Sequence, residues 1–175
     1  MKKPSLTQRS GKPALGTKQW LVIGVGNMDR GDDGAGLVVA RRMMRLSNNR
    51  HLVVESSGDA GDLIEMWKKE KRVILVDAMS SGSPPGSVRR FDLLHEVLPH
   101  SMLRSGSTHD FGIAHAIELS RALGKLPKQL ILFGIEGECF DLGAGICQAV
   151  EGAVQKTITL IRTEIFESNS RKTSG

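Results

Sequence analysis

The stretch that decides the fold is Leu21-Val-Ile-Gly-Val-Gly-Asn-Met-Asp-Arg-Gly-Asp-Asp-Gly-Ala-Gly36. It begins with apolar and β-branched residues and runs into glycines and an asparagine, which is typical of a buried strand that ends in a turn. Residues 35–46 then have the pattern of a helix, with Asp32 and Asp33 at its start, where negative charge is favourable. In an open α/β sheet, ligands bind between the end of a strand and the next helix. The stretch therefore predicts an α/β fold with two carboxylates at its functional edge.

A glycine-rich loop between a strand and a helix is also typical of dinucleotide-binding proteins, in which glycines let the backbone approach a pyrophosphate. Here the spacing disagrees, because Asp29 stands where the third glycine belongs when counted from Gly24 and Gly26. Asp32 and Asp33 would also repel phosphate, and no Gly-Lys-Ser/Thr follows as in a P-loop. The loop is better suited to a cation or to accepting hydrogen bonds.

The rest of the chain alternates between strand and helix patterns. We expect further strands at 51–56, 72–77, 87–91 and 129–136, and helices near 63–67, 93–98, 111–123 and 145–164. The run at 72–77 is apolar without alternation, which indicates a strand covered on both faces of a parallel sheet. The short strand at 87–91 is expected at the sheet edge. Asp110 is a natural N-cap for the helix that follows it, and Gly124 a natural stop.

The length of 175 residues suits one domain, and the net charge of +5 lies in its tails. Residues 1–19 carry five basic residues and no acid, and 167–175 carry a net of one positive charge, so that about −1 remains for 20–166. We therefore expect one folded domain at 20–166 between a basic disordered tail at 1–19 and a disordered tail at 167–175. Without a basic patch or a recognition motif in the folded part, we expect no nucleic-acid partner.

Cysteine usage and hydropathy indicate a cytoplasmic protein. Cys139 and Cys147 match neither a Cys-x-x-Cys motif nor a disulfide-rich secreted pattern, so we expect reduced thiols. No run of 18 apolar residues occurs, and the N-terminal segment lacks an apolar signal region. An acid-free basic leader also fits a transit peptide, although a simple tail is the plainer interpretation. We expect a monomer with no membrane partner.

Three side chains stand where strands and helices meet the predicted ligand edge. Asp33 follows the first strand, Asp77 ends the third, and His109 precedes a helix. Two carboxylates and an imidazole suit nickel, zinc, iron or manganese. The same residues also fit ordinary roles as a helix-start acid, a loop acceptor and a satisfied loop histidine. Spacing alone leaves both interpretations open.

Four motifs, in this order and at these spacings, resemble the hydrogenase maturation endopeptidases. They are Gly24-Val-Gly-Asn27 with Asp32-Asp33-Gly34, Leu75-Val-Asp77-Ala78 with Pro85-Gly86, Ser107-Thr-His109 before a helix, and Gly134-Ile-Glu136. The similarity runs from about Trp20 to Ile165. It implies an α/β three-layer sandwich with a twisted, mostly parallel five-stranded sheet and helices on both faces. This agrees with the fold predicted from the residues.

The resemblance implies an aspartic-type endopeptidase that removes the C-terminal extension of a nickel-iron hydrogenase large-subunit precursor after nickel insertion. The metal positions of the family fall on Asp33, Asp77 and His109, which would be both its catalytic and its metal-binding residues. The nickel belongs to the precursor, so the isolated enzyme is expected to be metal-free. The chain departs from the family at Asp29, where an apolar residue is common, and at the turn 57–61, where many members have Gly-Gly-Thr. A third departure is Ile146-Cys147 near the last helix, where an x-Leu-Ser-x pattern is common, and the second and third affect the expected substrate contacts. Which hydrogenase is processed therefore stays open.

Other protease chemistries lack their motifs here. The chain has no Gly-x-Ser-x-Gly elbow and no His-Glu-x-x-His, and neither cysteine sits at a strand-to-helix loop with a paired histidine. Two alternatives remain, a carboxylate metallohydrolase for small substrates and a nucleotide-binding regulatory domain. Glu136 ends a strand at the same edge and is a candidate for supporting the site. Ordinary surface or packing roles are expected for the other histidines, which are His51, His95, His100 and His115.

Overall fold

The computed structural model describes residues 20–46, 51–68, 70, 72–96 and 109–170, with the side chains at 109–111 and 169 outside the described part. The strands are β1 (Leu21–Val25), β2 (Leu52–Ser56), β3 (Arg72–Met79), β4 (Val88–Asp92) and β5 (Gln129–Glu136). The helices are the 3₁₀ turn η1 (Gly31–Gly34), α1 (Ala35–Leu46), α2 (Ala60–Trp67), α3 (His109–Ala122) and α4 (Gln148–Ser170). Within these residues, no helix is long and apolar enough to cross a bilayer.

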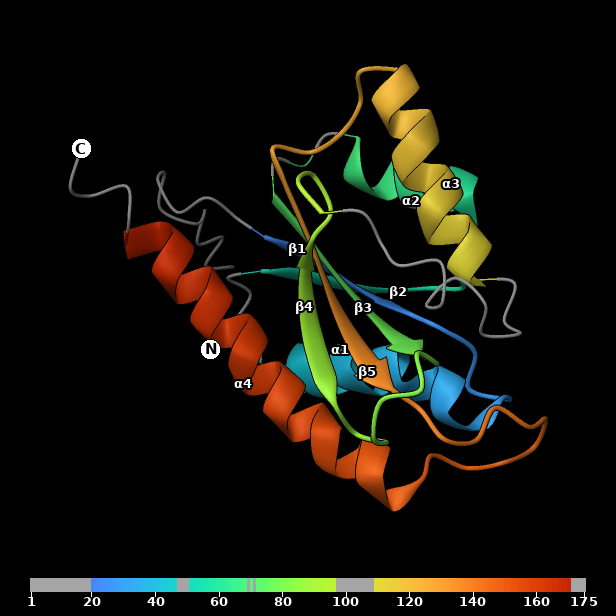
Figure 1. Cartoon of the computed structure of the whole chain (residues 1–175). Coiled ribbons are helices and arrows are strands. Elements are labelled where there is room, and N and C mark those ends of the chain that lie inside the picture. Colours follow the sequence, from blue (N-terminus) through green and yellow to red (C-terminus); the bar gives the residue numbers. More distant parts are fainter. Residues whose placement is uncertain (1–19, 47–50, 69, 71, 97–108, 171–175) are drawn as a thin grey trace, which may run out of the picture.

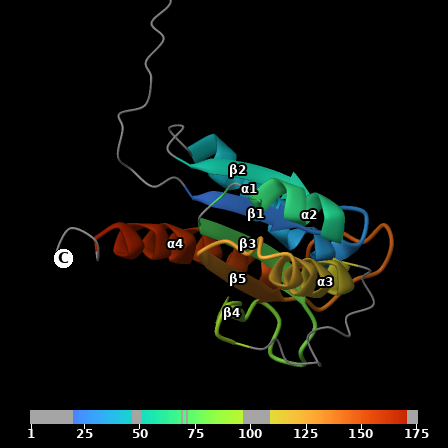
Figure 2. The same ribbon diagram turned by 90° about the horizontal axis from the view of Figure 1, so that it is seen from above.

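The five strands form one sheet in the order β2-β1-β3-β5-β4, so that β2 and β4 lie at its opposite margins (Figure 2). The pairs β1–β2, β1–β3 and β3–β5 are parallel, whereas β4 runs antiparallel to β5. This confirms the predicted mostly parallel five-stranded sheet. From β1 the chain first adds β2 on one side and then β3 on the other. The carboxyl ends of β1 and β3 therefore flank a topological switch point, where open α/β sheets bind ligands.

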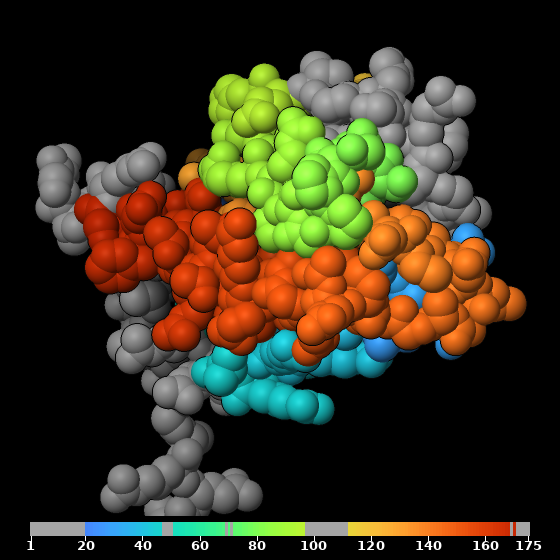
Figure 3. All heavy atoms as spheres, turned by 60° about the horizontal axis from the view of Figure 1, so that its bottom comes forward, coloured from blue at the N-terminus to red at the C-terminus, as the bar shows by residue number. Residues whose placement is uncertain are grey.

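Helices cover both faces of the sheet and complete the predicted three-layer sandwich (Figure 1). Residues of α1 and α4 pack on one face in a cluster that includes Trp20, Val22 and Ile74. Residues of α2 and α3 pack on the other face around Trp67 and Leu75. All eight residues of β3 are buried, as its unbroken apolar pattern predicts for a central strand. On the face drawn in Figure 3, α4 lies between α1 and the segment that leads into β4.

Several predicted element boundaries were wrong. The third strand does not end at Asp77, because Ala78 and Met79 continue its ladder with β5. The helix at 111–123 begins earlier, at His109, so Asp110 lies within its first turn and is not its N-cap. Residues 93–95 form a turn and not a brief helix, with the amides of residues 95 and 96 both donating to the carbonyl oxygen of Asp92. The end of that predicted helix, 97–98, lies outside the described residues.

The last helix also differs from its prediction of 145–164. It runs over Gln148–Ser170, so residues 167–170 are helical and do not belong to a disordered tail. No glycine or proline interrupts 153–170. Two contacts also hold its end, since Arg72 Nη2 donates to the Ser168 carbonyl at 3.1 Å and Ser170 Oγ donates to the Phe166 carbonyl at 3.1 Å. The predicted tails at 1–19 and 171–175 lie outside the described residues.

Candidate active site

The glycines of the first turn make room for the protein's own backbone. Gly26 has φ of +143°, and a Cβ there would lie 1.9 Å from the carbonyl oxygen of Asp33. Likewise, a Cβ on Gly36 would lie 2.2 Å from the Val76 carbonyl oxygen, so the first turn of α1 presses directly on β3. Only glycine permits such approaches. Close packing of the turn on the sheet thus explains the glycine pattern, and no bound pyrophosphate is needed to account for it.

Asp33 and Asp77 both lie buried at the carboxyl edge of the sheet. Asp33 is 2% exposed in η1, and Asp77 is 4% exposed near the end of β3. η1 contacts β3, so both carboxylates belong to the switch point between β1 and β3. The Ala78 amide donates to Asp77 Oδ1 at 2.9 Å. Two carboxylates at one edge offer oxygen ligands of the kind that bind metal ions, so this edge suits a metal ion.

His109, the third predicted site residue, is the first residue of α3. Its side chain lies outside the described part. A Cβ on Gly112 would lie 1.8 Å from the Gly58 carbonyl oxygen, so the first turn of α3 abuts the loop that follows β2. α3 therefore begins near the carboxyl edge of the sheet. Among the described side chains no three His, Cys, Asp or Glu residues form a metal site, so a three-ligand centre requires His109 and stays a prediction.

Asp32 has a different role from its neighbour Asp33. Fully buried, it accepts hydrogen bonds from the backbone amides of Glu138 at 2.8 Å, Cys139 at 3.0 Å and Cys147 at 2.7 Å. Its own amide donates to the Cys139 carbonyl at 2.8 Å. Burial raises the pKa of Asp32, but these amides outweigh burial and hold the pKa below its ordinary value. Asp32 therefore ties the loop at 137–147 to the turn that carries Asp33.

Sequence reasoning assigned Asp32 and Asp33 together to a cation or to accepting hydrogen bonds, but it did not separate their roles or identify the partners of Asp32. Nothing local identifies it, because its donors lie 106 to 115 residues further along the chain. Neither Cys139 nor Cys147 forms a disulfide, in agreement with the prediction. Burial raises the pKa of the Cys147 thiol, and hydrogen bonding to the Asp32 carboxylate raises it further. This thiol is therefore a poor nucleophile at neutral pH.

Glu136, the candidate supporting residue, holds a loop of the same edge. It is 2% exposed and accepts hydrogen bonds from Ser81 N at 2.6 Å, Ser81 Oγ at 2.7 Å and Gly82 N at 2.8 Å. Ser81 and Gly82 belong to the loop that follows β3. Glu136 thus fixes the path of the loop that follows β3, the strand that carries Asp77.

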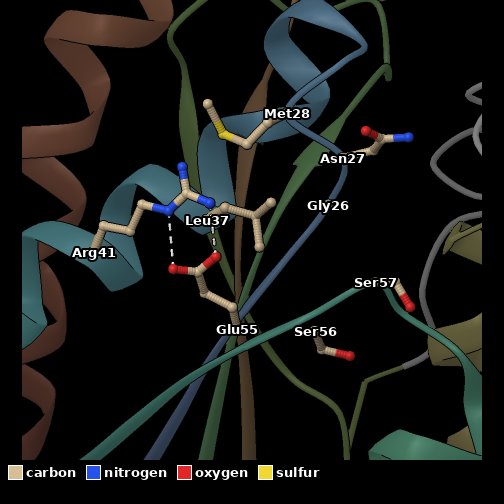
Figure 4. A pocket seen from close by; sticks show the side chains of 8 residues that line it. All are labelled: Gly26, Asn27, Met28, Leu37, Arg41, Glu55, Ser56 and Ser57. Carbon is tan, nitrogen blue, oxygen red and sulfur yellow. Dashed lines mark hydrogen bonds and ion pairs between the residues drawn. The ribbon is translucent and has the colours of Figure 1, made fainter.

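An open pocket of about 500 Å³ adjoins the first turn (Figure 4). Its wall combines the apolar side chains of Met28 and Leu37 with a charged pair, in which Arg41 Nε and Nη2 each donate to Glu55 at 2.9 Å. The remaining lining residues are Gly26, Asn27, Ser56 and Ser57. The pocket is therefore built by the β1–α1 turn, α1 and the end of β2. A ligand in it would lie beside the turn that leads to Asp33.

Known proteins resemble this chain in sequence and in fold. The family model described as Hydrogenase maturation protease matches residues 38–164. A protein of Methanocaldococcus jannaschii is 28% identical over 154 residues, covering 85% of this chain and 97% of its own length. The Hydrogenase 3 maturation protease of Escherichia coli is 25% identical, covering 85% of this chain and 91% of its own length. The solved structure of the hydrogenase maturating endopeptidase HybD from E. coli superposes with a TM-score of 0.73 at 22% identity, over 86% of this chain and 93% of that one, a likeness of fold.

Proposed function

This chain belongs to the hydrogenase maturation protease family, and on that premise we propose that it is an endopeptidase that removes the C-terminal extension of a nickel-iron hydrogenase large-subunit precursor. Cleavage follows insertion of nickel into the precursor. Asp33, Asp77 and His109 recognise that nickel, which arrives with the substrate. The other two candidates, a metallohydrolase for small substrates and a nucleotide-binding domain, do not account for the family match.

The observation that carries the proposal is a pair of buried carboxylates at the switch point. Asp33, in η1 after β1, and Asp77, in the neighbouring strand β3, lie at one edge, 2% and 4% exposed. α3 starts at His109 and abuts the same end of the sheet through Gly112. Two carboxylates and an imidazole form a donor set that suits divalent nickel, with coordination positions left for ligands from the precursor. The donor types thus fit a metal that is held only while the precursor is bound.

The chemical contribution of such a site is to position the precursor. By gripping a metal already seated next to the scissile bond, the three side chains hold that bond in one place against the enzyme, which lowers the entropic cost of reaction. A metal ion in this position polarises a carbonyl oxygen or lowers the pKa of a bound water. The loops fixed by Asp32 and Glu136 keep the two carboxylates rigid while the precursor binds.

The test is to incubate the protein with a large-subunit precursor, with and without nickel, and to follow loss of the extension by mass spectrometry. We expect cleavage of the nickel-loaded precursor only. Asp33→Ala, Asp77→Ala and His109→Ala should each lower the rate by about 100-fold or more, since loss of a supporting residue alone typically costs 10- to 100-fold. The control is His95→Ala. His95 is exposed and pairs with Asp92 at the end of β4, which lies beside the beginning of β5 and therefore away from the carboxyl edge.

Different results would remove different parts of the proposal. Equal cleavage of nickel-free precursor, or full activity of Asp33→Ala, would contradict recognition through nickel. Failure to cleave any cognate precursor would contradict the function itself. Micromolar binding of NAD, FAD or ATP by calorimetry would favour the nucleotide-binding alternative, and a metal that survives chelation and dialysis would favour the metallohydrolase.

A further inference from the structure

At the margin of the sheet, one side of the β2 backbone has no strand beside it among the described residues. In the described part of the chain its only strand partner is β1. The Leu52 amide donates to the Trp20 carbonyl, and the Ser56 carbonyl accepts from the Gly26 amide. Parallel pairing uses alternate residues, so residues 52, 54 and 56 face β1. The amide and carbonyl groups of Val53 and Glu55 therefore point outward, away from the sheet.

This edge lacks the features that keep natural edge strands from pairing. Such strands usually carry proline, lysine or a bulge. β2 reads Leu-Val-Val-Glu-Ser, and the charge of Glu55 is matched by its bidentate pair with Arg41. Leu52 is 47% exposed, which adds an apolar side chain at the start of the strand. The edge is therefore suited to accept an extended peptide.

The edge also leads to the candidate active site. Glu55, Ser56 and Ser57 line the open pocket, whose opposite side is the turn at 26–28 that continues to Asp33 (Figure 4). A chain that leaves the outer side of β2 at its carboxyl end thus enters the pocket. The pocket's far wall, the turn at 26–28, is bonded to the backbone of Asp33, since the Asn27 amide donates to the Asp33 carbonyl. The edge and the pocket therefore lead from the margin of the sheet to the turn that carries Asp33.

We propose that the C-terminal extension of the precursor binds as an added strand along the outer edge of β2, antiparallel to it. This inference rests on the proposed function. The folded body of the precursor, with its nickel, lies over Asp33 and Asp77, so the chain passes the scissile bond there and continues away through the pocket. It then runs along β2 from Glu55 towards Leu52. Its alternate backbone groups bond Val53 and Glu55, and its side chains on the α1 side contact the Arg41–Glu55 pair.

The first test removes the outward amide of Val53. This amide makes no hydrogen bond to β1, so the β1–β2 ladder is kept. Proline is tolerated in an edge strand where the amide faces solvent, so Val53→Pro should keep its fold, and Val53→Ala, which keeps the amide, is the matched control. The readout is the inhibition constant of a synthetic extension peptide against cleavage of the nickel-loaded precursor. Loss of one backbone hydrogen bond should weaken inhibition about 2- to 10-fold in Val53→Pro. Val53→Ala should change it less than twofold.

The second test leaves the enzyme intact and decides the matter should Val53→Pro fail to fold. Extension peptides are N-methylated at one residue at a time. Peptide amides that face β2 alternate along an added strand, so we expect methylation to weaken inhibition at every second residue. Uniform effects, or none, while the wild-type protein cleaves its precursor would overturn the added strand and leave the proposed function standing. If the wild-type protein cleaves no precursor, the function fails and this inference fails with it.

Discussion

Replacement of Asp32 isolates the contact that joins two distant loops. The carboxylate accepts three backbone hydrogen bonds, two at Oδ2 from Glu138 and Cys139 and one at Oδ1 from Cys147. Asp32→Ala removes all three acceptors. Asp32→Asn keeps one oxygen, which can serve the two amides at the Oδ2 position, but it turns an amide group towards the Cys147 N–H.

The expected cost follows from the number of amides left without an acceptor. A hydrogen bond to a charged group contributes about 1.5–3 kcal/mol, so the three bonds set an upper limit of about 9 kcal/mol. Because the loop at 137–147 is partly exposed and water can replace some bonds, we expect Asp32→Ala to lose about 3–5 kcal/mol. Asp32→Asn, in which the Cys147 amide and the new side-chain NH2 group face each other without an acceptor, should lose about 1–3 kcal/mol. Both are large against a total stability of about 5–15 kcal/mol for a domain.

Equilibrium unfolding in urea measures these differences in the free energy of unfolding, and we expect the variants to share one m value, the slope of that free energy against urea concentration. The control is Asp141→Asn in the same loop. Asp141 is exposed and its carboxylate lies 3.7 Å from the Cys139 thiol, so its replacement should change stability by less than about 0.5 kcal/mol. An Asp32→Ala protein within 0.5 kcal/mol of wild type, or an Asn variant less stable than the Ala variant, would refute the assignment of Asp32 as the anchor of this loop.

Four further outcomes are expected. The pKa of Asp32 in the folded protein lies below its unfolded value of about 3.9. The carboxylate therefore stabilises the fold above that pH, and this stabilisation is lost as the pH falls through the folded pKa. The difference in free energy of unfolding between wild type and Asp32→Asn, measured in urea, should narrow below about pH 4. Gly36→Ala should cost about 3 kcal/mol or more by urea unfolding, since its Cβ would lie 2.2 Å from a β3 carbonyl oxygen, whereas Gly152→Ala, in open space within α4, should stabilise by about 0.5–1 kcal/mol. Glu136→Gln should lose about 1–2 kcal/mol and speed hydrogen exchange in the loop after β3; unchanged exchange would contradict the anchoring role. Deletion of 1–17 should leave the melting temperature nearly unchanged, and a loss of several degrees would mean that this segment packs on the domain.

The arrangement of elements was predictable because this chain follows local rules closely. The limits of β5 and of α1 match the predicted ranges of 129–136 and 35–46, since apolar runs and helical spacing there agree with burial. The two carboxylates were also found from position, because strand ends mark the functional edge of an open sheet. Boundaries failed where pairing or tertiary contacts extended an element, as at Met79, which pairs with Glu136, and at the end of α4.

The contacts that hold the site in place were harder to predict from the sequence. Adjacent acids look alike in a sequence, yet Asp32 anchors a loop while Asp33 stands at the switch point. The difference depends on amides more than 100 residues away, which no local pattern encodes. The Arg41–Glu55 pair was hidden for the same reason, since its partners belong to α1 and β2 and meet only after the sheet has formed.

The anchoring of the first turn by the loop at 137–147 also sets when the site can exist. A ribosome releases the chain from its N-terminus, so the turn with Asp33 emerges long before its anchors. Until β5 has formed and the Cys147 amide has reached Asp32, that turn lacks three of the bonds that fix it. A nascent or C-terminally truncated chain therefore carries the carboxylates without their geometry. The turn that carries Asp33 can therefore reach its final geometry only after residues 138–147 have been synthesised, late in translation.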